Sequence, residues 1–104
     1  MNNKKAEKLY YKAIDAKNES ERLIGEAAKE IARKKGFNEE NVLLFDACFA
    51  SGYETVITFN GEGEMYDTGI ELFDAMTKEE FVGWFTRRKE LSEESVKLLE
   101  LELL

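Results

Sequence analysis

The chain has no histidine and one cysteine, and the 42 residues from Gly36 to Thr77 contain neither lysine nor arginine. Without histidine, the side chain that most often moves protons near neutral pH is missing, and nucleophile pairs that depend on it are excluded. A single cysteine excludes an internal disulfide bond. Proton chemistry would fall to carboxylates and tyrosines, so we expect a protein that is not an enzyme.

Signals for metals, cofactors and membranes are also missing. Asn60, Glu62 and Glu64 alternate as calcium ligands would, but Met65 occupies the sixth position, where an EF-hand loop requires glycine. No glycine-rich phosphate loop occurs, and no apolar run approaches the roughly 20 residues that span a bilayer. Residues 1–5 are followed by mixed charges, unlike a secretory signal. We expect no metal, no cofactor, no membrane contact and a cytoplasmic location.

The net charge of −7 is unevenly distributed. Residues 1–35 hold ten basic and six acidic side chains, a balance of +4, whereas residues 36–104 hold five and sixteen, a balance of −11. Such asymmetry often marks a charged partner. The alternative is that the basic segment packs against the acidic remainder and neutralises it internally.

The stretch without lysine or arginine combines nine acids with seven of the twelve aromatic residues. A disordered acidic chain would be poor in aromatics, so this composition predicts a folded segment. Strands with aromatic side chains on one face and acids on the other satisfy both features. The composition therefore predicts a sheet with a negative outer surface.

Residues 1–35 are predicted to be helical because their apolar side chains recur every three or four positions. The polar run from Lys17 to Ser20 interrupts this pattern, which leaves either one kinked helix or two helices. Basic residues at 33–35 suit the end of a helix, and Gly36 can adopt the left-handed cap conformation, with Phe37 folding back.

Two strands, Val42–Phe49 and Tyr53–Asn60, are predicted to form a hairpin. A three-residue loop, Ala50–Gly52, would place the two aromatic faces on the same side of the sheet. In that register Phe45 lies opposite Ile57. The core-facing residues would then be Leu43, Phe45, Ala47, Phe49, Tyr53, Thr55, Ile57 and Phe59.

A helix over residues 39–51 is the competing interpretation, capped by Asn38 and stopped by Gly52. Further along, residues 60–63 predict a chain reversal into a third strand, in which either Met65 or Tyr66 faces the core. Ile70–Phe73 could continue that strand or add another. These alternatives stay open on the sequence.

The chain is predicted to end in two helices. Thr77 and Glu80 form a capping box, and Ser92 is suited to begin the second helix. The end of that helix is ambiguous, because the final leucines surround a helix on nearly all sides, whereas the residues from Leu99 to Leu103 alternate as a strand would. Exposed leucines here would mark a contact with another chain.

The predicted fold is therefore a single α+β domain over residues 1–104. It consists of an N-terminal helix, kinked or divided in two, a three-stranded antiparallel β-meander and two C-terminal helices.

The leading functional hypothesis is a non-enzymatic protein whose acidic sheet face binds a basic surface, such as that of a nucleic-acid-binding enzyme. Small acidic inhibitors encoded by phages and mobile elements, including many anti-CRISPR and anti-restriction proteins, are similar in this general character and imitate nucleic acid. We expect no direct nucleic-acid binding, because the acidic remainder repels phosphates. The predicted partner-binding residues are Asp46, Glu54, Glu62, Glu64, Asp67 and Glu71.

The alternative is a self-associating or adaptor protein that works through an apolar C-terminal surface. Aromatic and leucine side chains supply much of the energy of protein interfaces. A homo-oligomer is compatible with this hypothesis. The residues predicted for this surface are Trp84, Phe85, Leu101 and Leu104.

Overall fold

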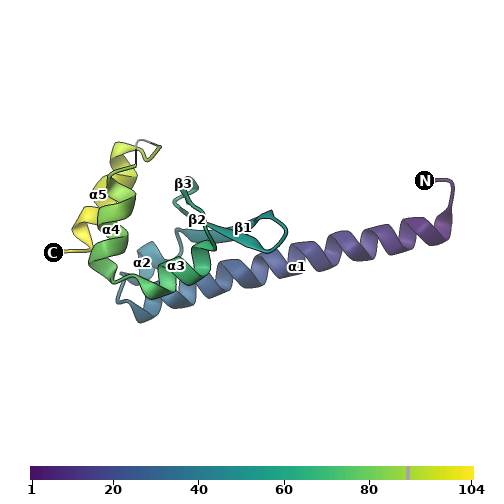
Figure 1. The fold of residues 1–104 in the computed structure, drawn as a ribbon, viewed down its shortest axis with the longest axis horizontal. Coiled ribbons are helices and arrows are strands. Elements are labelled where there is room, and N and C mark those ends of the chain that lie inside the picture. Colours follow the sequence, from purple (N-terminus) through teal and green to yellow (C-terminus); the bar gives the residue numbers. More distant parts are fainter. Residues whose placement is uncertain (89) are drawn as a thin grey trace.

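The computed structural model describes residues 1–88 and 90–104. A long N-terminal helix runs past a three-stranded antiparallel sheet, and two C-terminal helices stand at the end of the sheet farthest from the N-terminus (Figure 1). This arrangement confirms the predicted α+β class. The elements in chain order are α1 (Lys4–Lys34), α2 (Glu39–Val42), β1 (Phe45–Ser51), β2 (Glu54–Phe59), β3 (Glu62–Met65), α3 (Gly69–Ala75), α4 (Lys78–Thr86) and α5 (Glu93–Leu101).

Helix α1 is continuous over 31 residues, so the polar run at residues 17–20 neither breaks the helix nor divides it in two. The side chain of Asn3 caps its first turn by accepting a hydrogen bond from the Ala6 amide. The run contains residues of two ion pairs, Lys17 with Glu21 and Glu19 with Arg22, at helical spacing. Such pairs support the helix where apolar contacts are missing.

The C-terminus of α1 has the predicted glycine cap. Gly36 has a φ of +85°, in the left-handed region that a residue with a Cβ avoids. The amides of Gly36 and Phe37 donate to the carbonyls of Arg33 and Ala32, which is the pairing of a Schellman motif. This cap turns the chain so that Phe37 enters the core, where its ring centroid lies 5.0 Å from that of Phe45.

The hairpin forms, but the predicted pairing was wrong by two residues. Phe45 pairs with Phe59 instead of Ile57, and Tyr53 lies in the turn with 90% of its surface exposed. The turn has two residues, and a shift in register between Phe49 and Ser51 adds one residue to β1. That bulge returns the strands to the predicted faces, because a shift of two residues preserves the alternation.

The segment before β1 agrees in part with the helical prediction and in part with the strand prediction. Residues 39–42 form the short helix α2, capped by the side chain of Asn38 as the helical interpretation required. β1 begins three residues later than predicted, at Phe45. Leu43 therefore lies in a turn and is 71% exposed, whereas the preceding Val42 is buried. The prediction that Leu43 faces the core was wrong.

The third strand is confirmed, and Met65, not Tyr66, faces the core. The next segment is not a strand, because Gly69–Ala75 forms helix α3. The fold thus has one more helix after the sheet than the two predicted. Asp67 and Thr68 both have positive φ values, of 58° and 54°, and this sharp turn ends the sheet.

The two predicted C-terminal helices are α4 and α5. The capping box is present at α4, where the Thr77 hydroxyl accepts from the Glu80 amide and the Glu80 carboxylate from the Thr77 amide. Ser92 caps α5 through the Ser95 amide. Helix α5 continues to Leu101, so the strand-like alternation of the last leucines was misleading.

Phenylalanine rings from β1, β2, α3 and α4, together with that of Phe37, form the centre of the core. Phe45 of β1 is stacked on Phe73 of α3 with ring centroids 5.3 Å apart, and Phe73 lies 4.2 Å from Phe81 of α4. All three are fully buried. Each buried ring contributes about 1.5–3 kcal/mol of transfer free energy, and aromatic pairs add about 1 kcal/mol. This core holds the sheet and α4 together and thereby fixes the positions of the surface acids.

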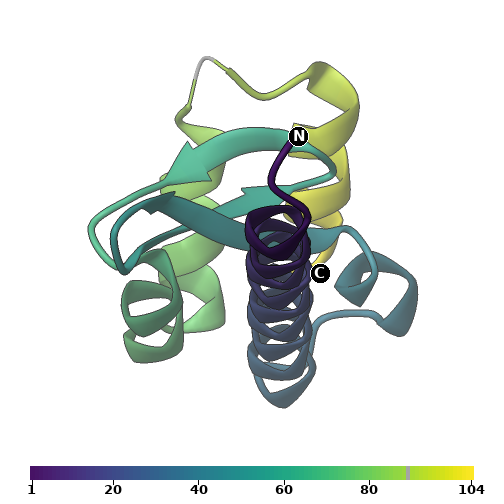
Figure 2. The same cartoon turned by 90° about the vertical axis from the view of Figure 1, so that its right-hand side faces the viewer.

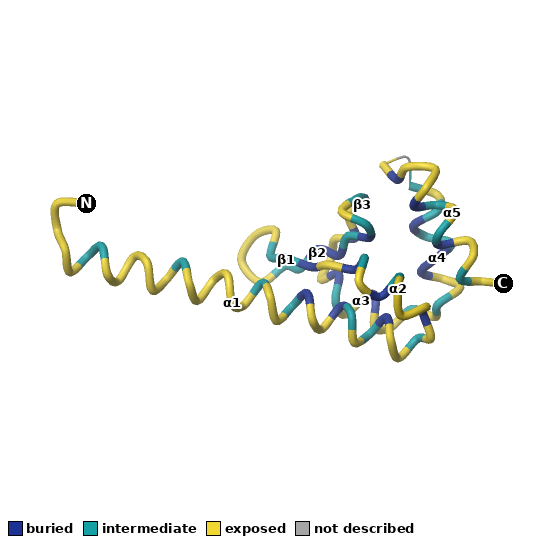
Figure 3. The backbone as a smooth tube through the Cα atoms, turned by 180° about the vertical axis from the view of Figure 1, so that it is seen from behind, coloured by how far each residue is buried: buried dark blue, intermediate teal, exposed yellow. Residues whose placement is uncertain are grey.

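The first half of α1 extends beyond this core as an isolated helix (Figures 1 and 3). We call residues 4–20 the arm; they are exposed except for Ala6, Glu7 and Ile14, which are half-buried. The molecule measures 58 × 26 × 24 Å, and its radius of gyration of 16.2 Å exceeds the roughly 13 Å of a compact chain of this length. The arm accounts for the difference.

Candidate acidic interface

Basic side chains of α1 neutralise the acidic side chains of the same helix. Five of its six acids form ion pairs three or four residues apart, with distances of 2.7–3.7 Å between nitrogen and oxygen. Among the described residues, the only ion pair between residues 1–35 and the acidic remainder joins Arg33 to Glu39, at 3.4 Å. The basic segment therefore neutralises little of the remainder by direct pairing.

The six predicted partner-binding acids have no such cation. In the part of the chain that the structure describes, none lies within 4.0 Å of a lysine or arginine nitrogen. Asp46, Glu64, Asp67 and Glu71 are exposed, and Glu54 and Glu62 are half-buried.

Asp46 and Glu64 lie near the thiol of Cys48, although they come from different strands. Burial raises the pKa of the Cys48 thiol. The charges of Glu21, Asp46 and Glu64 raise this pKa further, while the charge of Lys17 acts in the opposite direction. Charges shift a pKa strongly only at short range. Carboxylates of α1, β1 and β3 therefore share one neighbourhood.

Glu54 and Asp67 extend this neighbourhood across β2 to the turn after β3. The Glu54 carboxylate accepts a hydrogen bond of 3.2 Å from the Asp67 amide. Tyr66 donates its hydroxyl to Glu64, and this bond raises the pKa of Tyr66. The charges of Glu64 and Glu54 contribute to the same increase. We call Asp46, Glu54, Glu64 and Asp67 the acidic cluster.

The structure separates two of the predicted residues from this cluster. Glu62 accepts hydrogen bonds from the Ser92 hydroxyl at 2.9 Å, the Ser92 amide and the Ser95 hydroxyl. The hydroxyl bonds from Ser95 and Ser92 lower the pKa of Glu62. Its carboxylate thus anchors the start of α5. Glu71 lies in the first turn of α3, where a negative charge suits the helix dipole, and no hydrogen bond or ion pair joins it to the cluster among the described residues.

Sequence reasoning missed Glu21 and Tyr66 as neighbours of the cluster. Glu21 approaches from α1 because that helix packs closely on β1, at Gly25. A Cβ atom on Gly25 would lie 2.7 Å from the Asp46 carboxylate. Glycine within a helix often marks such a close approach, and it was the available sequence signal.

The apolar C-terminal surface is less continuous than predicted. Phe85 is fully buried and belongs to the core. Trp84 is half-buried, and the guanidinium of Arg88 lies 4.6 Å from the centre of its ring. Leu101 is half-exposed, and Leu104 is 97% exposed at the chain end. Of the four predicted residues, only these two leucines offer a largely free apolar surface.

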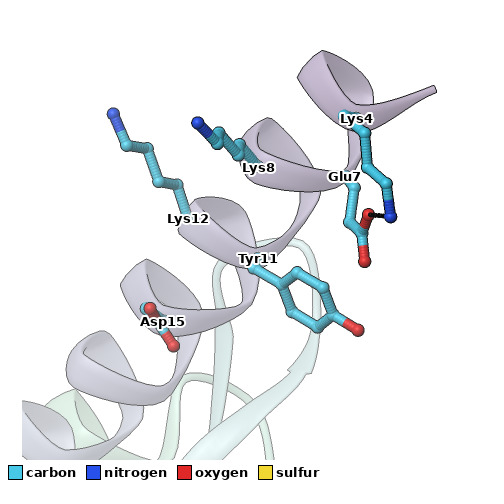
Figure 4. Close-up of a pocket in the computed structure, with 6 residues that line it drawn as sticks. All are labelled: Lys4, Glu7, Lys8, Tyr11, Lys12 and Asp15. Carbon is cyan, nitrogen blue, oxygen red and sulfur yellow. Dashed lines mark hydrogen bonds and ion pairs between the residues drawn. The ribbon is translucent and has the colours of Figure 1, made fainter. Parts of the chain in front are cut away.

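A shallow hollow of about 420 Å³ lies along the arm (Figure 4). One face of a single helix forms it, and no second element closes it. It is a space between long side chains on successive turns, which gives a small molecule little to bind against. The lining residues are Lys4, Glu7, Lys8, Tyr11, Lys12 and Asp15.

A second hollow, of about 350 Å³, lies next to the cluster, where α1 meets the turns at residues 43–44 and 60–61. Its lining includes Lys29, Leu43 and Asp46. The cluster therefore adjoins a recess with one exposed leucine, which could receive an apolar side chain beside a basic one.

Neither a metal-binding group nor a membrane span is found among the described residues. No group of three histidine, cysteine, aspartate or glutamate side chains among them is placed to hold a metal ion. Within the same residues, no helix is both long and apolar enough to cross a bilayer, since α1 is charged throughout. Comparison with protein-family models, with curated proteins and with solved structures finds no match to this chain.

Proposed function

We propose that this protein is a non-enzymatic interaction protein whose acidic cluster binds a basic surface on a partner protein. The observation that carries the proposal is that the four carboxylates have no ion-pairing cation among the described residues, whereas five of the six acids of α1 do. Like charges held close together repel one another. Lysine or arginine side chains of a partner would relieve that repulsion and steer the encounter.

A protein that binds nucleic acid is the partner class that this surface suits best. Its binding channel carries lysine and arginine side chains that contact phosphates. Asp46, Glu54 and Glu64 belong to three adjacent strands, so the sheet holds them at fixed spacing. Rigid elements hold a binding surface more accurately than a flexible tail does. Occupation of the channel would exclude nucleic acid, and the activity of this protein would then be inhibitory.

The test compares two variants that change the net charge equally. Glu54→Gln with Glu64→Lys alters the cluster, and Asp74→Asn with Glu100→Lys alters exposed positions outside it, in the last turns of α3 and α5. Each pair makes the protein more positive by three charges. Wild type and both variants serve as bait in a cell extract, and captured proteins are identified by mass spectrometry. Circular dichroism checks that each bait is folded.

The cluster variant should lose a partner that the wild type and the control variant retain. Capture by the wild type should also weaken between about 0.05 and 0.5 M salt, because screening shortens the range of these charges to a few ångströms. Equal capture by both variants, or capture that is indifferent to salt, contradicts the proposal.

A further inference from the structure

The arm leaves one helix face without a partner. Leu9 and Leu23 are 59% and 53% exposed, and the residues between them at helical spacing are exposed as well. Seen from the side, the sheet and the other helices lie along the C-terminal part of α1, and the arm projects beyond them (Figure 1). Figure 2 looks along α1 from its N-terminal end. We call this face the seam face; its residues are Leu9, Ala13, Ala16, Ser20, Leu23 and Ala27.

The seam face repeats every seven residues, in alternating steps of four and three. That repeat keeps the six positions within one narrow band of the helix, as in the contact line of a coiled coil. The positions that α1 buries in its own core, Gly25, Ala28 and Ala32, lie on a different side of the helix, about 100–160° around from the centre of this band. Pairing along the seam face therefore leaves those core contacts in place.

We propose that this face binds the same face of a second copy of the chain, with the two α1 helices antiparallel. We place the two-fold axis of the dimer between residues 14 and 15 of each helix. In this register, Leu9 packs on the partner's Ser20, and Ala13 packs on the partner's Ala16. Ala6 then packs on the partner's Leu23. Each large side chain meets a small one, which lets the helices approach closely.

Charge complementarity selects this arrangement. In the antiparallel register, Lys12 lies beside the partner's Glu19 and Lys5 beside the partner's Glu26, and symmetry makes each pair twice. Parallel helices would instead place Lys12 beside the partner's Lys17. Opposite charges that flank a seam set the orientation of helix pairs, and like charges oppose it.

The two α1 helices would be in contact over a long stretch. Residues 5–26 of each helix would be paired, which is about 33 Å at 1.5 Å per residue. Residues 1–20 carry five lysines against three acids, and the antiparallel pairing brings them toward the partner's acidic remainder. It also gives the arm tertiary contacts that it lacks in one copy, and most of the stability of helices in proteins comes from such packing.

The experiment measures molar mass by light scattering over a range of concentrations, with two matched variants. Ala16→Glu places a carboxylate on the seam face, and Asn18→Glu places one on the opposite side of the same turn; both positions are exposed. We expect wild type and Asn18→Glu to reach twice the 12.0 kDa of one chain. Ala16→Glu should dimerise at least tenfold more weakly. A wild type that stays at 12.0 kDa up to about millimolar concentration overturns the proposal, as does an unaffected Ala16→Glu.

A charge exchange tests the register without changing the seam face. Lys12→Glu would face the partner's Glu19 and should weaken the dimer, whereas Lys12→Glu combined with Glu19→Lys restores opposite charges and should recover it. Both residues are exposed, but Glu19→Lys also removes the ion pair of Glu19 with Arg22, so circular dichroism checks that each variant keeps its helix. Failure of the double variant to recover the dimer overturns the antiparallel register. Because the acidic cluster is untouched, partner capture should be the same in all these variants.

Discussion

Helix α1 and the sheet carry carboxylates in two different electrostatic situations. On α1, acids and bases lie three or four residues apart, so the helix supplies its own counterions. On the sheet, spatial neighbours come from different strands, and the segment that forms those strands contains no lysine or arginine. Charges on α1 thus support α1, whereas the acidic cluster remains available to a partner.

Packing divides the molecule in the same way. Phenylalanine rings of the sheet and of α3 and α4 lie in the core, whereas the arm's Tyr10 and Tyr11 are each 56% exposed, with ring centroids 5.8 Å apart. Stability should therefore reside almost entirely outside the arm. Three measurements, given in order of decreasing effect, test this difference between the arm and the rest of the molecule.

The largest effect is expected from removal of a core ring. Phe45→Ala should lower the free energy of unfolding by about 3–5 kcal/mol, because it leaves a cavity among Phe37, Phe59 and Phe73. Small domains are stable by only about 5–15 kcal/mol, so this variant should be close to unfolding. Denaturant unfolding followed by circular dichroism measures the change.

Tyr11→Ala is the matched control in the arm. It removes a ring of similar size from an exposed position on the side of α1 away from the seam face, so the change should stay below about 0.5 kcal/mol. A loss of several kcal/mol at Tyr11 would show that the arm is part of the cooperative core, and the division between the two regions would fail.

The sequence predicted most of this core but not the pairing within it. Alternation decided which face each strand residue occupies, and a capping box located the start of α4, because both are local patterns. The bulge between Phe49 and Ser51 left no local signature, so the hairpin register was wrong while its faces were right. Helix α3 was missed because the short segment around Ile70 shows no clear helical period.

The candidate site was predictable in composition and not in geometry. Absence of lysine and arginine identified the acidic segment. In the structure, the charges of Asp46 and Glu64 act on Cys48, and those of Glu64 and Glu54 act on Tyr66. Other contacts span 30 residues or more, and no pattern in the sequence announces them. Glu62 accepts a hydrogen bond from Ser92 in this way, so this predicted binding residue also holds the start of α5 in place.

Glu102 provides an intermediate effect, because it does have a cation, unlike the acids of the cluster. Its side chain is 5% exposed, lies 3.2 Å from the Lys78 ammonium and accepts from the Asn38 amide at 2.9 Å. Burial by itself would raise the pKa of Glu102, but hydrogen bonds from Asn38, Asn41 and Lys78 lower it overall. Glu102→Gln should cost about 2 kcal/mol of stability at pH 7.

The sign of the pH dependence follows from the lowered pKa. The folded state favours the charged form, so this contribution is fully present above the ordinary glutamate pKa of about 4.3 and is lost as the pH falls through the lower folded value. The difference between wild type and Glu102→Gln should therefore shrink in acid. Glu100→Gln, at an exposed position two residues away, should change stability by less than about 0.5 kcal/mol at any pH. Equal losses at both positions contradict this account.

The smallest effect is expected in the reactivity of Cys48, which depends on the electrostatic field of the acidic cluster. Only the thiolate form of a cysteine reacts with iodoacetamide, and the raised pKa of Cys48 keeps that form scarce at pH 8. Glu64→Gln removes one of the charges that raise this pKa, so alkylation should accelerate, on the order of twofold, since burial still opposes the thiolate. Glu71→Gln, which neutralises an acid of α3 outside the cluster, should leave the rate unchanged.

The twofold difference should also diminish at high salt, because partly exposed charges are screened. If Glu64→Gln and Glu71→Gln react alike, the carboxylates around Cys48 do not act as a unit. The sheet would then resemble α1, in which nearby cations compensate the acidic charges.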